Sequence, residues 1–304
     1  MVRNLAAIIL SAAIVAGGCA ARDFGELPKD AKERALLCGR AGVMLIGVTP
    51  VDDKARFDRL ADKVRKLSNE DGFYTLFPEG NSDPAKVLGD EAAIQGAVGS
   101  HWLTTVNSCF RAYGIEEEPV PALPQAAYDR AIACAASLAY DNLGTQKPNP
   151  ESRVVYDPQA GYFIHKAAVA AGGATYLVKA SDDATTRFQQ AATNGAARAW
   201  ADQCKQEDAK AVKAVAVLPA EEPAALLMCD DVLSFAMEGG MAIGAAQSEQ
   251  AKRYAGGYRA VHARLEQAPG ARADAQLVEE TIKRVAEAGR LDQVSDACIA
   301  RFVR

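Results

Sequence analysis

The spacing of six cysteines constrains the fold of this chain more than any other feature of its sequence. The intervals between them alternate, at 71, 25, 70, 25 and 69 residues. A period of about 95 residues, present three times, is typical of tandem repeats. The sequence therefore predicts three repeats, each with one cysteine near its start and one near its end: Cys38 and Cys109, Cys134 and Cys204, Cys229 and Cys298.

Apolar residues recur at matching distances from the first cysteine of each repeat. Leu36, Ile132 and Leu227 stand two residues before it, and Met44, Tyr140 and Phe235 stand six residues after it. A separation of eight residues places both positions on one face of a helix. No stretch alternates apolar and polar residues at the period of two that a strand requires. We therefore predict an all-α fold of three tandem helical bundles.

Local signals predict three long helices in each repeat. Thr49–Asp52 combines a capping residue, a proline and an acid, and Ser181–Asp183 offers similar caps, so both are predicted helix starts. Gly47, Gly144 and Gly239 follow the first helix and predict its end. Proline-bearing segments beginning at Ile115 and Val215 mark the boundaries. The predicted units are a signal at 1–21 and repeats at 22–118, 119–218 and 219–304.

The N-terminus has the pattern of a secretory signal. Arg3 is followed by an apolar stretch from Leu5 to Ala16 that contains a single serine. Twelve residues are too few to span a bilayer as a helix, but they suit the central region of a signal sequence. We therefore expect the chain to be exported.

The end of this stretch, Ala16-Gly17-Gly18-Cys19, resembles the lipobox of bacterial lipoproteins. The resemblance implies that Cys19 is lipidated and becomes the mature N-terminus. Ala20 follows it in place of the aspartate that retains such proteins at the inner membrane, which implies a periplasmic protein anchored to the outer membrane. Ala16 stands where the lipobox prefers leucine, so ordinary cleavage after Ala20 or Ala21 is the alternative.

The chain has seven cysteines, but Cys19 is either lipidated or removed with the signal, so six remain in the folded protein. An even number of cysteines in an exported chain favours disulfides over metal or redox chemistry. Pairing within a repeat closes loops of roughly 70 residues, and pairing across a boundary closes loops of roughly 25; the chain-entropy estimates are about 4 and 3.5 kcal/mol. These energies do not decide the pairing. Symmetry does, because pairing within each repeat uses all six cysteines by one rule, whereas pairing across boundaries leaves Cys38 to find Cys298.

The sequence contains no recognisable catalytic, cofactor or metal site. His101, His165 and His262 fall at different places in the repeat and have no carboxylate or cysteine at metal-ligand spacing. The motifs of serine hydrolases, redox dithiols and phosphate-binding loops are absent. With 34 basic and 39 acidic residues and no strongly basic unit, nucleic-acid binding has no electrostatic support.

The units differ most in their loops, where function is often added. Unit one carries Phe73, Tyr74 and Phe77 in DGFYTLFPEGNS, and unit two carries GTQKPNPESRVVYDP from Gly144. The three aromatic residues form a candidate binding loop. The alternative is that they close the end of a small bundle.

The leading functional hypothesis is an exported envelope protein, held at the membrane by a lipid anchor, that acts as a non-enzymatic binding or scaffold module. Its partner would be an envelope protein or a cell-wall component. The alternative is a cell-envelope hydrolase whose carboxylate pair is assembled only by the fold. An enzyme would require a cleft with convergent polar groups and displaced pKa values.

Overall fold

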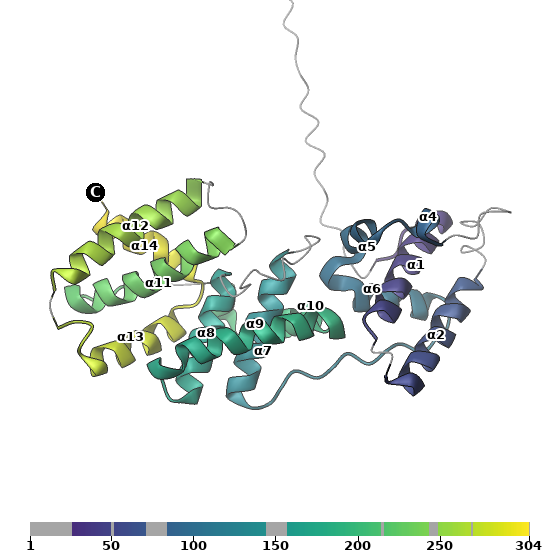
Figure 1. Ribbon diagram of the computed structural model, residues 1–304, viewed down its shortest axis with the longest axis horizontal. Coiled ribbons are helices and arrows are strands. Elements are labelled where there is room, and N and C mark those ends of the chain that lie inside the picture. The colour runs from purple at the N-terminus through teal and green to yellow at the C-terminus, as the bar shows by residue number, and fades with distance from the viewer. Residues whose placement is uncertain are drawn as a thin grey trace, which may run out of the picture.

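Every regular element in the described part of the chain is helical. The computed structural model describes residues 26–49, 52–70, 84–143, 157–213, 216–242, 249–268 and 270–303, and within these ranges no strand is present. Three disulfides divide the helices into three groups, which we call the first, middle and third groups. Figure 1 shows them in a row, with the middle group between the other two.

The first group contains α1 (Ala31–Gly47), α2 (Lys54–Ser68), α4 (Pro84–Leu88), α5 (Glu91–Val98), the 3-10 turn η1 (Gly99–His101) and α6 (Trp102–Ala112). The middle group contains α7 (Ala127–Leu143), α8 (Pro158–Ala171), η3 (Ala174–Tyr176), α9 (Leu177–Asn194), α10 (Ala197–Glu207) and η4 (Ala209–Ala211). The third group contains α11 (Glu222–Ala242), α12 (Glu249–Glu266), α13 (Ala275–Ala288) and α14 (Leu291–Phe302).

Each disulfide joins the first helix of a group to its last helix. The bonds are Cys38–Cys109 between α1 and α6, Cys134–Cys204 between α7 and α10, and Cys229–Cys298 between α11 and α14. These are the pairs expected from symmetry. Each of the six cysteines is the eighth residue of its helix. In every group the disulfide therefore joins its two helices at the same position along each helix.

A separate cluster of buried apolar side chains surrounds each disulfide. In the first group Trp102 and Phe110 pack beside Cys38–Cys109, and in the middle group Tyr162 and Trp200 belong to the cluster that contains Cys134–Cys204. Bulky apolar residues in the last helix of each group, four or seven positions before its cysteine, are also buried: Trp102, Trp200, Leu291 and Val294. Each disulfide is therefore part of a core.

A Leu-Pro pair that the sequence analysis overlooked precedes each group. The prolines are Pro28, Pro124 and Pro219, each ten residues before the first cysteine of its group. Each proline carbonyl accepts a hydrogen bond from an arginine: Arg34 at 3.1 Å, Arg130 at 3.2 Å and Arg301 at 2.5 Å. The leucines pack on the three cores. The segment leading into each group is therefore fixed in the same way.

Several predicted helix boundaries are wrong. Helix α2 begins at Lys54, because the side chain of Asp53 accepts a hydrogen bond from the Arg56 backbone and caps the helix there. Ser181–Asp183 lies inside α9, which ends where Gly195 adopts a left-handed φ of 68°. Within the described ranges the middle and third groups each contain four α-helices, where the sequence predicted three.

The glycines predicted to end the first helices do not act as left-handed caps in the described ranges. Gly47 is the last residue of α1, and Val48 caps it in a right-handed conformation. Gly239 lies within α11, which continues to Ala242. Gly144 lies outside the described residues.

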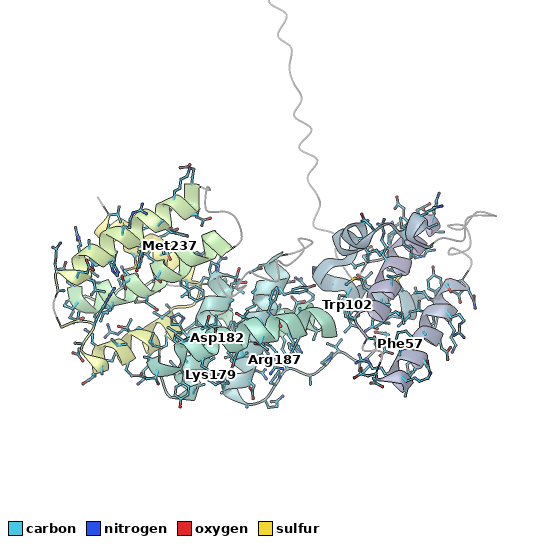
Figure 2. The ribbon with its side chains drawn as sticks, viewed as in Figure 1. Phe57, Trp102, Lys179, Asp182, Arg187 and Met237 are labelled. Atoms are coloured by element: carbon cyan, nitrogen blue, oxygen red, sulfur yellow. A yellow bond between two sulfur atoms is a disulfide. The ribbon has the colours of Figure 1, made fainter. Side chains whose placement is uncertain are left out.

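The first and middle groups meet where α7 and α10 contact η1, and where Gly195, the residue that caps α9, approaches α6. A Cβ atom on Gly195 would lie 2.6 Å from both Leu103 Cβ and Trp102 Cζ2, so only glycine fits this approach. Trp102 lies on the side of the first group that faces the middle group (Figure 2). The buried His101 lies close to the Asp141–Arg198 ion pair of the middle group.

The middle and third groups share a more extensive interface, centred on α8. Helix α13 packs along α8, and its Ile282 is part of the buried cluster of the middle group. Gly161 lets α14 and α11 approach α8, because a Cβ there would lie 2.6 Å from atoms of Leu291 and Phe235. On the same helix, His165 Nε2 lies 2.8 Å from Asp231 Oδ2 of α11.

Candidate functional site

The structure does not test the binding residues expected from the sequence, because it does not describe that part of the chain. Cys19 and the aromatic residues Phe73, Tyr74 and Phe77 lie outside the described residues, as does the loop that follows Gly144. The six other cysteines are buried in disulfides. The candidate site was not anticipated: it is a cleft between the middle and third groups.

This cleft has a volume of about 690 Å³. Helices α7 and α8 and the turn η4 form one wall, and α13 forms the other. Small-molecule sites in proteins typically have volumes of roughly 300–1,000 Å³ and mostly apolar linings. The size fits such a site, and so do the apolar residues that line it: Ala127, Ala131, Val169, Ala170, Ala209 and Ala286.

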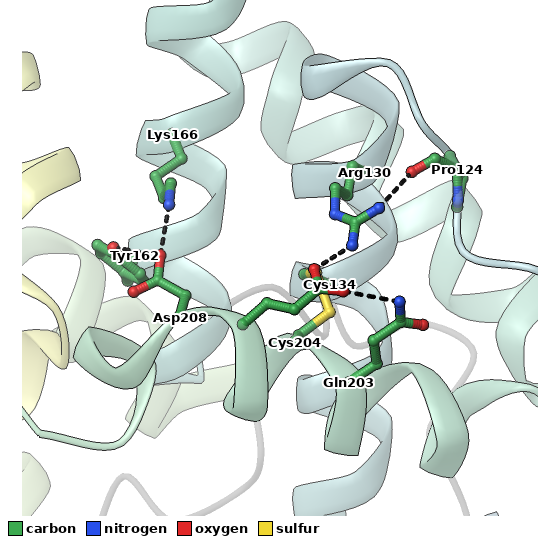
Figure 3. The surroundings of a disulfide bond; sticks show 9 residues. Pro124, Arg130, Cys134, Tyr162, Lys166, Gln203, Cys204 and Asp208 are labelled. Carbon is green, nitrogen blue, oxygen red and sulfur yellow. Dashed lines mark hydrogen bonds and ion pairs between the residues drawn. A yellow bond between two sulfur atoms is a disulfide. The ribbon is translucent and has the colours of Figure 1, made fainter.

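Asp208, in the turn after α10, organises the polar part of the cleft. The Tyr162 hydroxyl donates a 2.8 Å hydrogen bond to Asp208 Oδ2, and the Lys166 ammonium binds the same oxygen. Asp208 Oδ1 accepts a hydrogen bond from the Lys210 backbone, which caps η4. Figure 3 shows Lys166 and Tyr162 converging on Asp208 from α8. Both carboxylate oxygens are therefore occupied.

These contacts determine the protonation states. Burial acts to raise the pKa of the Asp208 carboxyl, but hydrogen bonds from Lys166 and Tyr162 outweigh it and hold the pKa below its usual value. Burial raises the pKa of the Tyr162 hydroxyl, and its bond to Asp208 raises it further. Asp208 is therefore an anionic acceptor near neutral pH, and Tyr162 remains a neutral donor.

A second recess of about 250 Å³ continues the cleft towards the disulfide Cys134–Cys204. Arg130 forms an ion pair with Glu207 there, and Gln203 donates a 2.7 Å hydrogen bond to the same carboxylate. The hydrogen bond from Arg130, followed by that from Gln203, lowers the pKa of Glu207. Figure 3 shows Arg130 and Gln203 beside the sulfur bridge. This end of the cleft is a network of paired charges.

A third recess of about 310 Å³ lies at the opposite end. It shares Lys210 and Glu287 with the main cleft. The other residues that line it are Lys213, Val217, Arg284 and Ala288. Three cations and one carboxylate give this recess a positive balance.

The histidines lie away from the cleft, and two of them contact neighbouring aspartates of α11. His165 pairs with Asp231, and His262 Nδ1 lies 2.8 Å from Asp230. His101 is buried at the junction with the first group, where burial and nearby Arg198 lower its pKa to about 4. The pairing of histidine with aspartate could not be read from sequence spacing, because the partners lie 66 and 32 residues apart.

Tyr162 belongs to the buried core of the middle group, but it also has a polar role that apolar spacing in the sequence does not indicate. The side chain is 1% exposed, yet its hydroxyl reaches Asp208. A signal was present: Arg130 stands four residues before Cys134, and Asp208 four residues after Cys204. Since residues four apart share a helix face, charges at these positions lie next to the disulfide.

Among the residues that the structure places, no group of three or more histidine, cysteine or carboxylate side chains is arranged to hold a metal ion. No helix in the same ranges combines the length and the apolar character needed to cross a bilayer. No protein-family model matches the chain, and no curated protein or solved structure has significant similarity to it.

Proposed function

We propose that the chain is an exported, lipid-anchored and non-enzymatic envelope protein that binds a small molecule in the cleft between its middle and third groups. In this proposal the protein consists of three tandem repeats. Three shared features support a common origin of the groups. Each cysteine is the eighth residue of its helix, a Leu-Pro pair precedes each group, and an arginine donates a hydrogen bond to each proline carbonyl. Three disulfides support an oxidising compartment.

The observation that carries the binding function is the state of the charges at the centre of the cleft. Asp208 is held by Lys166 and Tyr162, and Glu207 is held by Arg130. Groups fixed in this way shape a site without offering a free base or acid. An apolar cleft of this volume with a few oriented polar groups is the usual form of a ligand site.

The carboxyl groups of the cleft do not have the pKa values that the hydrolase alternative requires. A glycosidase-like pair needs one carboxyl with a raised pKa and one that stays ionised. Glu207 and Asp208 are adjacent in the cleft, but both have lowered pKa values because of their hydrogen bonds to cationic side chains. Burial raises the pKa of Asp157, but this carboxylate caps α8 and binds Asn142, so it is committed to structure.

The anchor is tested at Cys19. In a bacterial host, Cys19→Ser should move the protein from the membrane fraction to the soluble fraction and abolish labelling by an alkyne fatty acid, because acyl chains hold lipoproteins at a bilayer. A wild-type protein that takes up no label and is soluble would exclude the anchor. Removal of the anchor leaves the cleft intact, so the binding test below is independent of this result.

Binding is tested by native mass spectrometry of the full-length protein purified from its own cell envelope. We expect a bound small molecule that is released on denaturation. Ala170→Trp should abolish it, because Ala170 is an exposed residue of α8 that lines the cleft, and an indole there would fill the space. Ala55→Trp is the matched control, since Ala55 is an exposed helical alanine on α2.

Two results would refute the binding function. One is a protein that carries no adduct and shows no thermal stabilisation by an envelope extract. The other is an adduct that survives Ala170→Trp and Ala55→Trp equally. Release of soluble fragments from purified cell wall by the wild type, lost in Asp208→Asn, would favour the hydrolase.

A further inference from the structure

The main cleft and the recess lined by Lys213 and Arg284 adjoin each other. Lys210 and Glu287 line both, so the two cavities meet between η4 and the end of α13. A single elongated molecule can therefore occupy the cleft and extend into this recess. The two parts differ in chemistry, and that difference indicates what the molecule must look like.

The recess carries unpaired positive charge. Neither Lys210 nor Lys213 forms an ion pair with a described residue, whereas Lys166 is bound to Asp208. Arg284 contacts Glu280 at 3.8 Å, and both side chains are largely exposed, so this pair is weak. One carboxylate, Glu287, faces these three cations. An anionic group placed here would gain attraction without breaking a strong pair.

The main cleft offers an apolar surface instead. Its walls are lined by the alanines of α7, α8 and α13 together with Val169. Charged side chains also line it, but Lys166 is paired with Asp208, Glu207 with Arg130, and Lys283 with Glu279. Its buried donor, the Tyr162 hydroxyl, is already used by Asp208. A polar chain lying here would lose its hydrogen bonds to water and find few replacements, whereas an alkyl chain would gain from burial.

We infer that the cleft binds an amphipathic anion, with an alkyl chain between α8 and α13 and a carboxylate or phosphate head beside Lys210 and Lys213. This inference rests on the proposed binding function and specifies its ligand class. The charge balance of the recess disfavours a cationic head, and the apolar walls disfavour a sugar or a peptide backbone. A free fatty acid supplies the carboxylate, and a single-chain phospholipid supplies the phosphate.

The test is calorimetric titration of the full-length protein with matched amphiphiles below their micellar concentrations. Dodecanoate and dodecyl phosphate carry the same chain with different anionic heads, and dodecyltrimethylammonium reverses the charge. We expect at least one anionic amphiphile to bind in a 1:1 ratio, at least tenfold more tightly than the cationic one. Acetate and inorganic phosphate should show no binding, because they lack the chain.

The head position is tested with Lys210→Glu/Lys213→Glu. This double variant should weaken binding of the anionic amphiphile at least tenfold and reduce its dependence on salt, because the charges that attract the head are reversed. Lys29→Glu/Lys32→Glu changes two exposed lysines of the first group by the same amount and should have no effect. Ala170→Trp should abolish binding of every amphiphile, and Ala55→Trp should not.

The outcomes separate the ligand class from the binding function. The anionic head is overturned if cationic and anionic amphiphiles bind equally tightly, or if Lys210→Glu/Lys213→Glu leaves the affinity unchanged. Either result leaves the binding function intact, provided that Ala170→Trp still blocks binding. Binding that Ala170→Trp does not change overturns both proposals. Tighter binding of dodecanoate identifies a free carboxylate as the preferred head, and tighter binding of dodecyl phosphate identifies a phospholipid-type head.

Discussion

Glycine occupies the positions where helices approach each other most closely. A Cβ on Gly161 of α8 would lie 2.6 Å from Leu291 and Phe235 of the third group, and Leu291 is almost fully buried. Gly256 of α12 has no atom within 4 Å of such a Cβ. The sequence alone gives no basis for distinguishing these two helical glycines.

Gly161→Ala should therefore destabilise the protein relative to Gly256→Ala. Alanine gains about 1 kcal/mol of helix propensity over glycine at either position. At Gly161 the added methyl also overpacks the interface, at a cost of roughly 1–3 kcal/mol. Urea denaturation of both variants measures the difference, and equal stability would mean that α8, α11 and α14 are not in close contact.

His165 is fully buried between the middle and third groups, and its hydrogen bonds define its charge. Nδ1 lies 2.7 Å from the Gly161 carbonyl, which can only accept, so Nδ1 carries a proton. Nε2 can then donate to Asp231 only if the ring is doubly protonated. Burial acts to lower the pKa of His165, but the Asp231 carboxylate outweighs it and raises the pKa above 6.5.

The His165–Asp231 pair should make the protein less stable as the pH rises. Because the pKa of His165 is raised by folding, its contribution is fully present below pH 6.5 and is lost as the pH rises through the raised pKa. Between pH 6.5 and the raised pKa, the free energy of unfolding should fall more in the wild type than in His165→Gln. Denaturation series at several pH values measure this difference, and parallel curves for the two proteins would rule out the charged pair.

His101, at the junction of the first and middle groups, should make the protein less stable as the pH falls. Burial and Arg198 lower its pKa to about 4, so its contribution is present above pH 6.5 and is lost as the pH falls towards 4. His101→Gln should therefore reduce the acid sensitivity of the protein, measured in the same series. A variant that is as acid-sensitive as wild type would mean that folding does not lower the pKa of His101.

At the scale of elements, the repeating positions of the cysteines predicted the disulfide pairs, and apolar spacing predicted helices. Helix boundaries were predicted less well because they depend on single residues. Asp53 rather than Thr49 caps α2, and the left-handed Gly195 divides a stretch that was predicted as one helix. The Leu-Pro segments recur in the sequence, but their function depends on arginine bonds, one of which comes from the distant α14.

Each disulfide clamps the first and last helices of its group. Cys134→Ser/Cys204→Ser should lower the free energy of unfolding by about 2–5 kcal/mol, because the unfolded chain regains the freedom of a loop of 70 residues. Two-state urea denaturation with tryptophan fluorescence measures the loss, since Trp200 lies in the same core. A loss below about 1 kcal/mol would contradict the chain-entropy estimate, in which the bond stabilises the protein by constraining the unfolded chain.

At the scale of the whole molecule, the cleft could not be predicted because its walls come from distant segments. Tyr162, Asp208 and Glu287 meet only when α13 packs on α8. The boundary segments also proved to be part of the structure. Glu118 is buried and accepts a 2.6 Å hydrogen bond from Lys63, so the segment between the first two groups is held against the first.

Because each predicted repeat has its own disulfide and its own apolar faces, the sequence predicts that residues 125–210 fold alone, the alternative being a continuous helical solenoid. The contacts of the middle group modify this expectation. Such a fragment would lack Ile282, which completes its core, and the Pro121 carbonyl that binds the Trp200 indole at 2.7 Å. We expect cooperative thermal melting of fragments 22–118 and 119–304, followed by circular dichroism, and a lower midpoint or no cooperative melt for 125–210. A fragment 125–210 as stable as 119–304 would show that α13 adds nothing to the middle group.

If the middle and third groups together form one ligand-binding cleft, its ligand should protect both of them from hydrogen exchange. The experiment compares the protein as isolated from the envelope with the same protein after its bound small molecules are extracted. We expect extraction to speed exchange in α8, in residues 208–213 and in α13, and to leave exchange in α1 and α2 unchanged. Faster exchange confined to the first group, or an unchanged α13, would contradict it.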